Sequence, residues 1–297
     1  MIIDGRTRLA GIVGWPVDRS LSPAMHNAAY EALGLNWVYL PLPLHEQTGL
    51  LRFTDAARSL PFVGFNVTMP HKQAMLDLCD EVAMFAQMAG AVNTVHCVDG
   101  RLIGYNTDGR GLIEALESEV GFVPEGKRIA LIGAGGAAGA AVVALVLAKA
   151  AHISIVNRDP MRSEGLLDRL SGYMRTTSSE SLLLDAGAED AISGADLVIN
   201  ATPVGLKADD PSPVPESWFG PSQVVCDMIY QQQTTALLRG AATAGAKTLG
   251  GLPMLVAQGA LSIDIWSDSA QVTAPRDAMR AAAEGAFSLL ATQGGAE

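Results

Sequence analysis

The stretch IALIGAGGAAG, residues 129–139, decides how the middle of this chain folds. Its apolar beginning predicts a buried strand, and the alanine-rich run after it predicts a buried helix. Between them, Gly133, Gly135 and Ala138 follow the spacing G-x-G-x-x-A. In a strand–turn–helix unit, such a turn lets the backbone approach a pyrophosphate, and the first N–H groups of the helix donate to it. We therefore predict a dinucleotide-binding turn; the alternative is a glycine turn that only packs the helix closely on the sheet.

The uncharged run around this turn, residues 129–148, is long enough to span a bilayer. Its glycines interrupt the run, and its many alanines contribute little hydrophobicity. A buried strand followed by a buried helix explains the segment better than a membrane span does. We therefore expect no membrane partner.

The next predicted strand, residues 152–157, leads into the sequence NRDPMR. At this place NAD-binding folds usually carry an acidic residue for the ribose hydroxyls, whereas NADP-binding folds use arginine. Asn157 and Arg158 come first, and Arg162 lies four residues beyond Arg158, so two guanidinium groups could clamp a 2′-phosphate. Asp159 could accept from an NAD ribose or repel the phosphate. We favour NADP as the cofactor and leave NAD open.

Strands alternate with helices along most of the chain, which predicts an α/β protein with parallel sheets. The predicted strands are residues 9–14, 37–44, 62–67, 128–133, 152–157, 196–201, 223–230 and 247–251. The predicted helices are the segment that Ser22 caps and Gly34 closes, and residues 46–58, 136–150, 160–170, 234–244, 252–266 and 275–292. Residues 71–88 are expected to be mostly helical, in two pieces. Residues 90–109 predict a hairpin that turns at Asp99-Gly100, and a helix start follows. A domain boundary is expected near residue 107.

The composition is that of a globular protein, with 49% hydrophobic and 17% charged residues. A net charge of −11 and an isoelectric point of about 4.9 disfavour polyanionic partners, so we expect no nucleic acid. Cys79, Cys97 and Cys226 are widely spaced and odd in number, which predicts reduced thiols in the cytoplasm. The N-terminal residues carry charges and no long apolar core, so we expect no signal peptide. The histidines and cysteines show no metal-ligand spacing, and we expect no metal.

The stretch NVTMPHK, residues 66–72, breaks a local rule of helix formation. Pro70 fits the first turn of a helix, which would place Lys72 beside unpaired N–H groups and the positive end of the helix dipole. That field would favour the neutral amine, so Lys72 is a candidate proton carrier. Asp108, expected in the first turn of a later helix, is a candidate ionised partner. The alternatives are an exposed lysine and a simple capping aspartate.

Nine motifs, in order along nearly the whole chain, resemble those of the shikimate dehydrogenase family, which includes quinate/shikimate dehydrogenases. They are SLSPAMHN (20–27), NVTMPHK (66–72), GAVNT (90–94), GYNTDGRG (104–111), GAGGA (133–137), NRDPMR (157–162), ATPVG (201–205), DMIY (227–230) and GGLPMLVAQGA (250–260). The resemblance implies an NADP- or NAD-linked oxidoreductase that interconverts the 3-hydroxyl of shikimate and the ketone of 3-dehydroshikimate, in chorismate and aromatic amino acid biosynthesis. It also implies a substrate-binding catalytic domain, residues 1–107 and 252–297, and a Rossmann domain, residues 108–251.

The resemblance further implies roles for individual residues. The implied catalytic residues are Lys72 and Asp108. The implied substrate contacts are Ser20, Ser22, Thr68, Asn93, Tyr230 and Gln258. The expected cofactor contacts are Gly133, Ala134, Gly135, Gly136, Ala137, Asn157, Arg158, Asp159, Arg162, Met228 and Gly251. We expect a small-molecule substrate, and we leave a homodimer open.

The chain departs from the family pattern at a few positions. The strongest NADP signature of the relatives has threonine or serine where this chain has Asp159, many relatives carry a proline soon after Tyr230, Pro253 replaces a common glycine, and Ile263 replaces an aromatic residue. One alternative is therefore an NAD(P)-linked quinate/shikimate dehydrogenase, or a relative that acts on a modified cyclohexene carboxylate. An alternative of another class is a nucleotide-binding regulatory protein without turnover.

Overall fold

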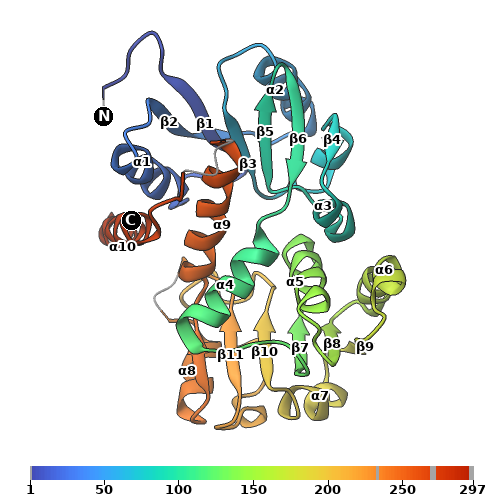
Figure 1. Ribbon diagram of the computed structural model, residues 1–297. Coiled ribbons are helices and arrows are strands. Elements are labelled where there is room, and N and C mark those ends of the chain that lie inside the picture. Colours follow the sequence, from blue (N-terminus) through green and yellow to red (C-terminus); the bar gives the residue numbers. More distant parts are fainter. Residues whose placement is uncertain (1, 232–233, 268–271, 294–297) are drawn as a thin grey trace. The chain divides into compact units, whose positions relative to one another are not determined.

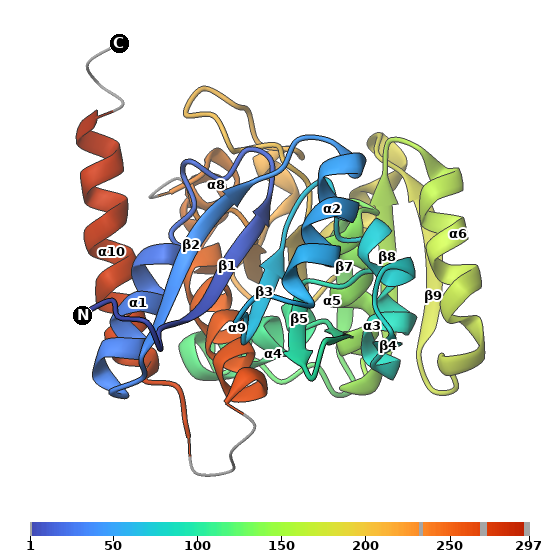
Figure 2. The same ribbon diagram turned by 90° about the horizontal axis from the view of Figure 1, so that it is seen from above.

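The computed structural model describes residues 2–231, 234–267 and 272–293 (Figures 1 and 2). The chain forms two compact units. Unit 1 comprises residues 1–107 and 256–297, and unit 2 comprises residues 108–255. The chain therefore leaves unit 1, completes unit 2, and returns to unit 1.

Unit 1 is built on a six-stranded sheet in the order β2-β1-β3-β5-β6-β4. Its strands are β1 (Arg8–Gly14), β2 (Trp37–Pro43), β3 (Gly64–Val67), β4 (Glu81–Val82), β5 (Thr94–Val98) and β6 (Arg101–Tyr105). Its helices are α1 (Ser22–Ala32), α2 (Gln47–Ala57), α3 (Met84–Ala89), α10 (Arg276–Gln293) and the later part of α9 (Gly251–Trp266). Strands β1, β2 and β3 are parallel, whereas β5 pairs antiparallel with β3 and β6, so this sheet is mixed.

Unit 2 is built on a six-stranded sheet in which every pairing is parallel. Its strands are β7 (Arg128–Ile132), β8 (His152–Asn157), β9 (Ser178–Leu183), β10 (Leu197–Asn200), β11 (Val224–Asp227) and β12 (Lys247–Leu249). Its helices are α4 (Asp108–Val120), α5 (Gly136–Leu147), α6 (Pro160–Leu170), α7 (Glu189–Ser193), α8 (Ala236–Thr243) and the first turn of α9. The order β9-β8-β7-β10-β11-β12 is that of dinucleotide-binding folds, whose ligand lies where the strand order reverses, between β7 and β10.

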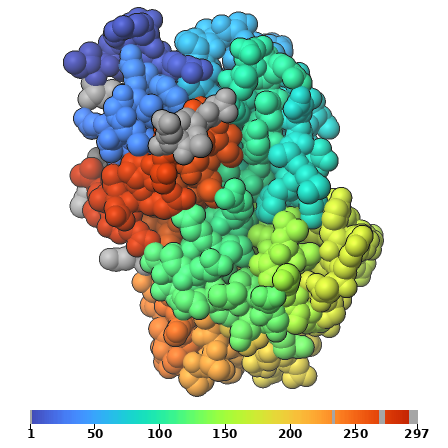
Figure 3. All heavy atoms as spheres, in the orientation of Figure 1, coloured from blue at the N-terminus to red at the C-terminus, as the bar shows by residue number. Residues whose placement is uncertain are grey.

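Helix α5 explains the uncharged run in the middle of the sequence. Its residues from Ala138 to Val146 are all buried, and within unit 2 the helix packs against α4. The buried positions of α4 recur at helical spacing, at Gly111, Leu112, Ala115 and Leu116. In the space-filling view the green side chains of α4 lie across the visible face of unit 2 (Figure 3). No helix within the described residues has both the length and the apolarity to cross a membrane.

The predicted α/β class is confirmed, as is the hairpin turn at Asp99 and Gly100, whose φ angles are 50° and 76°. The prediction that residues 71–88 are mostly helical, in two pieces, is confirmed in part. That segment holds a short 3₁₀ helix (Ala74–Asp77), the strand β4, and only then α3. The sequence analysis also missed β9 and α7, which are polar and very short respectively.

Candidate active site

In unit 1, the loops that follow β1 and β3 interlock at the carboxyl ends of these two parallel strands. The Thr68 N–H donates to Val13 O at 2.8 Å, and the Trp15 N–H donates to Met69 O at 2.8 Å. Gly14 is required between them, because a Cβ there would lie 2.2 Å from Thr68 Cγ2. In open α/β sheets, ligands bind outside the carboxyl ends of the strands. The interlocked loops carry three of the predicted substrate contacts to that edge, namely Ser20, Ser22 and Thr68.

The prediction that Ser22 caps α1 is wrong. Ser22 is the first residue of the helix, Leu21 occupies the cap position, and Leu21 makes no side-chain cap bond. Instead, Ser20 Oγ accepts from the Ser22 N–H at 3.3 Å. The two serines therefore form one compact polar pair at the start of α1, and Ser22 is 3% exposed.

The local reason given for singling out Lys72 is also wrong. Pro70 follows a cis peptide bond and does not open a helix, and Lys72 lies in a turn before the 3₁₀ helix. Lys72 is therefore not in the first turn of a helix. Its carbonyl accepts from the Val92 N–H at 2.8 Å, next to Asn93 in the sequence. The backbone thus brings Lys72, Thr68 and Asn93 to the end of β3.

Two predicted substrate contacts, Asn93 and Gln258, meet directly in unit 1. Asn93 Nδ2 donates to Gln258 Oε1 at 3.2 Å, and both side chains are buried, with 2% and 9% exposed. Asn93 is also hydrogen-bonded to Thr107, the last residue of unit 1 before Asp108. These contacts place α9 against the segment after β6. The same edge of the sheet therefore carries amide groups that suit the hydroxyls of a polar ligand.

In unit 2, the turn after β7 has the geometry expected of a dinucleotide-binding turn. Gly133 has φ +111°, a conformation that favours glycine, and a Cβ there would lie 3.2 Å from Ala201 O. Gly135 is the N-cap of α5 and provides no side-chain cap. A Cβ on Gly135 would meet no protein atom within 4 Å, so the space beside it is open. The uncapped N–H groups of α5 and this open space fit a pyrophosphate.

The segment after β8 presents two arginines and one tethered carboxylate. Asp159 caps α6, because its Oδ1 accepts from the Met161 N–H at 3.2 Å. Its Oδ2 lies 3.5 Å from Arg162 Nε, in a pair whose side chains are 54% and 75% exposed. Asn157 Nδ2 donates to Asp159 O at 2.8 Å and fixes the start of the turn. Asp159 therefore has structural partners of its own at the place where a 2′-phosphate or a ribose would be recognised.

The remaining predicted cofactor contacts lie at the ends of β11 and β12. Gly251 donates its N–H to Ile229 O at 3.1 Å, and a Cβ on Gly251 would lie 2.4 Å from Met228 O. Only glycine permits this close approach. Tyr230 follows Ile229 in the sequence, and burial raises the pKa of the Tyr230 phenol. Asp108 is the first residue of α4 and is 6% exposed, so the predicted position in a helix first turn is confirmed.

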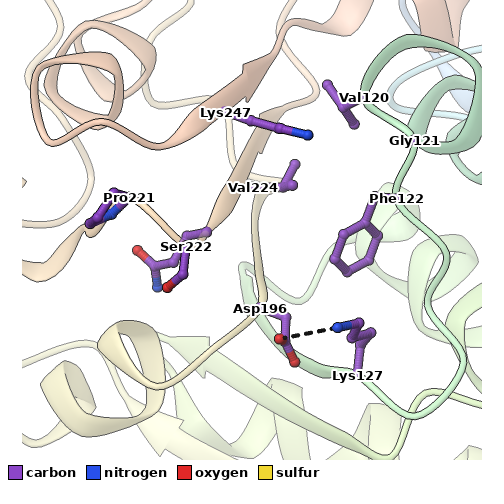
Figure 4. A pocket seen from close by; sticks show the side chains of 10 residues that line it. Val120, Gly121, Phe122, Lys127, Asp196, Pro221, Ser222, Val224 and Lys247 are labelled. Atoms are coloured by element: carbon purple, nitrogen blue, oxygen red, sulfur yellow. Dashed lines mark ion pairs between the residues drawn. The ribbon is translucent and has the colours of Figure 1, made fainter.

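A second hollow in unit 2 lies at the opposite, amino-terminal ends of the strands (Figure 4). This pocket has a volume of about 200 Å³ and is lined by residues that include Phe122, Lys127, Asp196 and Lys247. Lys127 Nζ lies 3.6 Å from Asp196 Oδ1. None of the predicted site residues lines it. No group of His, Cys, Asp or Glu in the described part of the chain is arranged to hold a metal ion.

Two family models match the chain. One is described as the shikimate dehydrogenase substrate binding domain and matches residues 12–95; the other is described as shikimate / quinate 5-dehydrogenase and matches residues 116–205. The chain is also 44% identical over 271 residues to a shikimate dehydrogenase (NADP(+)) of Citrifermentans bemidjiense, with 90% of this chain and 92% of that relative covered. The chain belongs to the shikimate dehydrogenase family.

Solved structures of shikimate dehydrogenases share the fold over nearly the whole chain. One in complex with NADP+ is 37% identical, with a TM-score of 0.87, and the match covers 96% of this chain and 98% of that one. One from Thermus thermophilus in complex with NADP(H) and shikimate is 36% identical, with a TM-score of 0.82 and coverage of 94% and 99%.

This member of the shikimate dehydrogenase family contains further buried polar residues near the site in each unit, which were not predicted from the sequence. In unit 1 they are Asn66, Thr94, Thr107 and Ser262. In unit 2, Asn200 Nδ2 donates to Asp227 Oδ1 at 3.0 Å, at the ends of β10 and β11. The available signal was a polar residue at or next to the end of an otherwise apolar strand, as in FNV, VIN and VCD. That signal does not separate a ligand contact from a buried supporting residue.

Proposed function

We propose that this protein is an NADP-linked shikimate dehydrogenase that reversibly reduces 3-dehydroshikimate to shikimate. The observation that carries the proposal is the 44% identity to a relative named shikimate dehydrogenase (NADP(+)) over nine-tenths of both chains. The parallel sheet of unit 2 and the open glycine turn after β7 support the cofactor. The polar edge of unit 1 supports a small hydroxylated acid as the substrate.

The chemistry divides between the nicotinamide and the protein. When bound at the turn after β7, the cofactor would supply hydride transfer from the carbinol carbon of shikimate, and to the ketone in the reverse direction. The amine of Lys72 takes the hydroxyl proton in the oxidative direction, and its ammonium polarises and protonates the ketone oxygen in the reverse direction. Asp108, at the start of α4 where a carboxylate is stabilised, orients Lys72 and accepts from a neighbouring hydroxyl. Neither group is assigned as the sole acid or base.

Most of the proposed substrate contacts belong to unit 1, and the proposed cofactor contacts belong to unit 2. In unit 1, Ser20 and Ser22 suit the carboxylate, and Thr68, Asn93 and Gln258 suit ring hydroxyls. Tyr230 adds a further contact from unit 2. The cofactor-binding residues of unit 2 are the turn from Gly133 to Ala137, Asn157, Arg158, Asp159, Arg162, Met228 and Gly251. In this proposal the substrate domain is residues 1–107 and 252–297, and the Rossmann domain is residues 108–251. In the structure, unit 2 extends to Leu255 and unit 1 resumes at Val256, four residues after the proposed boundary.

An assay at 340 nm that crosses shikimate and quinate with NADP and NAD tests the proposed function. We expect the fastest turnover for shikimate with NADP. Preferred turnover of quinate, or a preference for NAD, would place the protein in the quinate/shikimate branch. Tight NADP binding without turnover of any shikimate-like acid would support the non-catalytic alternative instead.

Substitution of Lys72 tests the assignment of the proton carrier. We expect Lys72→Ala to lower kcat by at least about 100-fold, since a positioned acid–base group contributes about 10²–10⁴-fold. The KM for NADP should change little, because Lys72 belongs to unit 1. Lys127→Ala is the control, because it removes an exposed lysine of the pocket at the amino-terminal strand ends. A Lys72→Ala enzyme that keeps kcat within tenfold of wild type would refute the assignment.

Two departures from the family pattern bear on the alternative substrates. Ile263 is 0% exposed, so it packs in the core of unit 1 and reaches a ligand only through its neighbours. Asp159 remains the observation that favours NAD, and it motivates the quinate/shikimate alternative. We also propose a cytoplasmic location, because all three cysteines are free thiols.

A further inference from the structure

Unit 1 contains a connected set of buried polar side chains, here called the amide network, at the carboxyl edge of its sheet. It joins β2, β3, β5, the segment after β6, and α9. Its members are each at most 9% exposed and are Tyr39, Asn66, Asn93, Thr94, Thr107, Gln258 and Ser262. Buried polar groups are costly unless they are hydrogen-bonded, and a fully connected network fixes one arrangement of its members. Only two of the seven, Asn93 and Gln258, belong to the proposed substrate contacts.

A backbone group fixes the orientation of the Asn93 amide. The Thr107 N–H can only donate, and it lies 2.8 Å from Asn93 Oδ1, so the oxygen of this amide must face Thr107. Asn93 Nδ2 therefore faces Gln258 Oε1 at 3.2 Å. The amide of Gln258 is in turn oriented with its oxygen toward Asn93 and its nitrogen on the opposite side. One backbone N–H thus sets the direction of two side-chain amides in series.

Thr94 connects this pair to the rest of the network. Its Oγ1 donates to Asn93 Oδ1 at 3.0 Å and accepts from Asn66 Nδ2 at 3.0 Å. It also lies 2.9 Å from Ser262 Oγ, and Ser262 donates to Gln258 O at 3.0 Å on α9. Thr94 therefore contacts both Asn93, its neighbour in the sequence, and the helix that carries Gln258.

Asn66 holds Thr94 in place and is itself oriented by the backbone. Its Nδ2 lies 3.2 Å from Asn93 O, an acceptor only, so the nitrogen must face that carbonyl. The same Nδ2 donates to Ser262 Oγ at 2.9 Å. On the other side, Asn66 Oδ1 accepts from the Tyr39 hydroxyl at 2.8 Å. The three acceptors around Asn66 Nδ2 share its two hydrogens. Thr94 and Ser262 have one hydrogen each, so a hydrogen bond between them takes the place of one of their other donor contacts.

We propose that Thr94 is a positioning residue for substrate binding, which holds the amide of Asn93 directly and that of Gln258 through Ser262 and Asn93, in one orientation. This inference rests on the proposed function, because it takes these amides to be contacts of the shikimate hydroxyls. A ring that carries hydroxyl groups presents hydrogen-bond donors and acceptors at fixed places. A side-chain amide that turned by half a rotation would therefore offer its oxygen where its nitrogen is needed. The amide network therefore selects the arrangement of hydroxyl groups on the ligand, although its members other than Asn93 and Gln258 need not touch the ligand.

The test compares Thr94→Val, Thr94→Ser and Ser262→Ala with wild type in steady-state kinetics of the full chain. Thr94→Val removes the bridging hydroxyl at constant shape, and we expect the KM for shikimate to rise about tenfold, the size of effect that one net hydrogen bond can have. Ser262→Ala should act in the same direction, and Thr94→Ser should stay within about twofold of wild type. The KM for NADP should stay within about twofold in all three.

Thr54→Val is the matched control, because it removes a hydroxyl that is 3% exposed and bonded to Leu51 O, outside the network. It should leave both KM values unchanged. A Thr94→Val enzyme whose KM for shikimate stays within twofold, or a Thr54→Val enzyme that shifts it equally, would overturn the positioning role alone. A wild-type protein that does not turn over shikimate would overturn the proposed function, and the inference with it.

Discussion

Asp159 lies at the position predicted to distinguish NAD from NADP, and the structure gives it two partners inside the protein. Its carboxylate caps α6 through the Met161 N–H and pairs with Arg162. The sequence could suggest the subsite from the two arginines, but it could not reveal these contacts, because a carboxylate at a helix start can serve as an N-cap or as a ribose ligand. In the proposed enzyme, a 2′-phosphate competes with Asp159 for Arg162.

Replacement of Asp159 by asparagine should therefore shift the cofactor preference toward NADP. We expect Asp159→Asn to lower the KM for NADP about three- to tenfold and to raise the KM for NAD. Asparagine keeps the N-cap while it removes the charge that opposes the phosphate. Initial rates with each cofactor at saturating shikimate measure this ratio.

Glu164→Gln is the matched control for this change, because it removes another exposed carboxylate from α6. It should leave the ratio of the two KM values within about twofold. An unchanged ratio in Asp159→Asn would mean that Asp159 serves the helix alone.

At the scale of elements, the agreement between sequence and structure depends on how strongly a segment is buried. The apolar strands β7, β8 and β10 were predictable because both faces of a parallel sheet are covered. Strand β9, with the sequence SSESLL, was missed because it is an edge strand with polar residues. The turn that carries Lys72 was read as a helix because Pro70 satisfies the local rule for a helix start, although long-range bonds to Val92 decide the backbone there.

Helix α8 depends on one threonine that serves two elements. The Thr235 side chain caps α8 by accepting from the Leu238 N–H, and its hydroxyl donates to Asp227 Oδ2 at 2.6 Å at the end of β11. Burial raises the pKa of Asp227, so each donor to this carboxylate matters. We expect Thr235→Ala to lower the free energy of unfolding by about 2–4 kcal/mol, from a lost cap and a lost bond to a charged group.

Denaturant unfolding at pH 7 measures this loss, and Thr243→Ala at the other end of α8 is the control. Thr243 only donates to Arg239 O on the exposed side, so its removal should cost less than about 0.5 kcal/mol. Equal costs for the two variants would contradict the double role of Thr235.

At the scale of the whole molecule, the net charge of −11 makes the ionisation of carboxylates central to stability. Asp80 is the clearest case in unit 1. Hydrogen bonds from the Arg58 guanidinium and from the Leu102 N–H hold the pKa of its carboxyl below the usual 3.8. A lowered folded-state pKa means that the stabilising contribution is present above pH 3.8 and is lost as the pH falls below it.

Asp80→Asn should therefore lower the melting temperature at pH 7 by a few degrees. The difference from wild type should shrink as the pH falls below 3.8, because the wild-type carboxyl is then protonated as well. Thermal unfolding across this pH range gives the comparison. Asp55→Asn, an exposed carboxylate on α2, is the control and should match wild type throughout. A difference that stays constant with pH would rule out an ionic origin.

The insertion of unit 2 within unit 1 has a consequence for synthesis on the ribosome. Residues 108–255 leave the exit tunnel as one continuous segment, so unit 2 has its whole sheet before the chain is finished. Unit 1 has to wait: α1 packs against α10, and Gly259 of α9 lies where a Cβ would be 2.6 Å from Met25 Cε. Until those last helices emerge, the nascent chain carries an exposed apolar face on its earliest residues, which is the interval in which a chaperone would be needed.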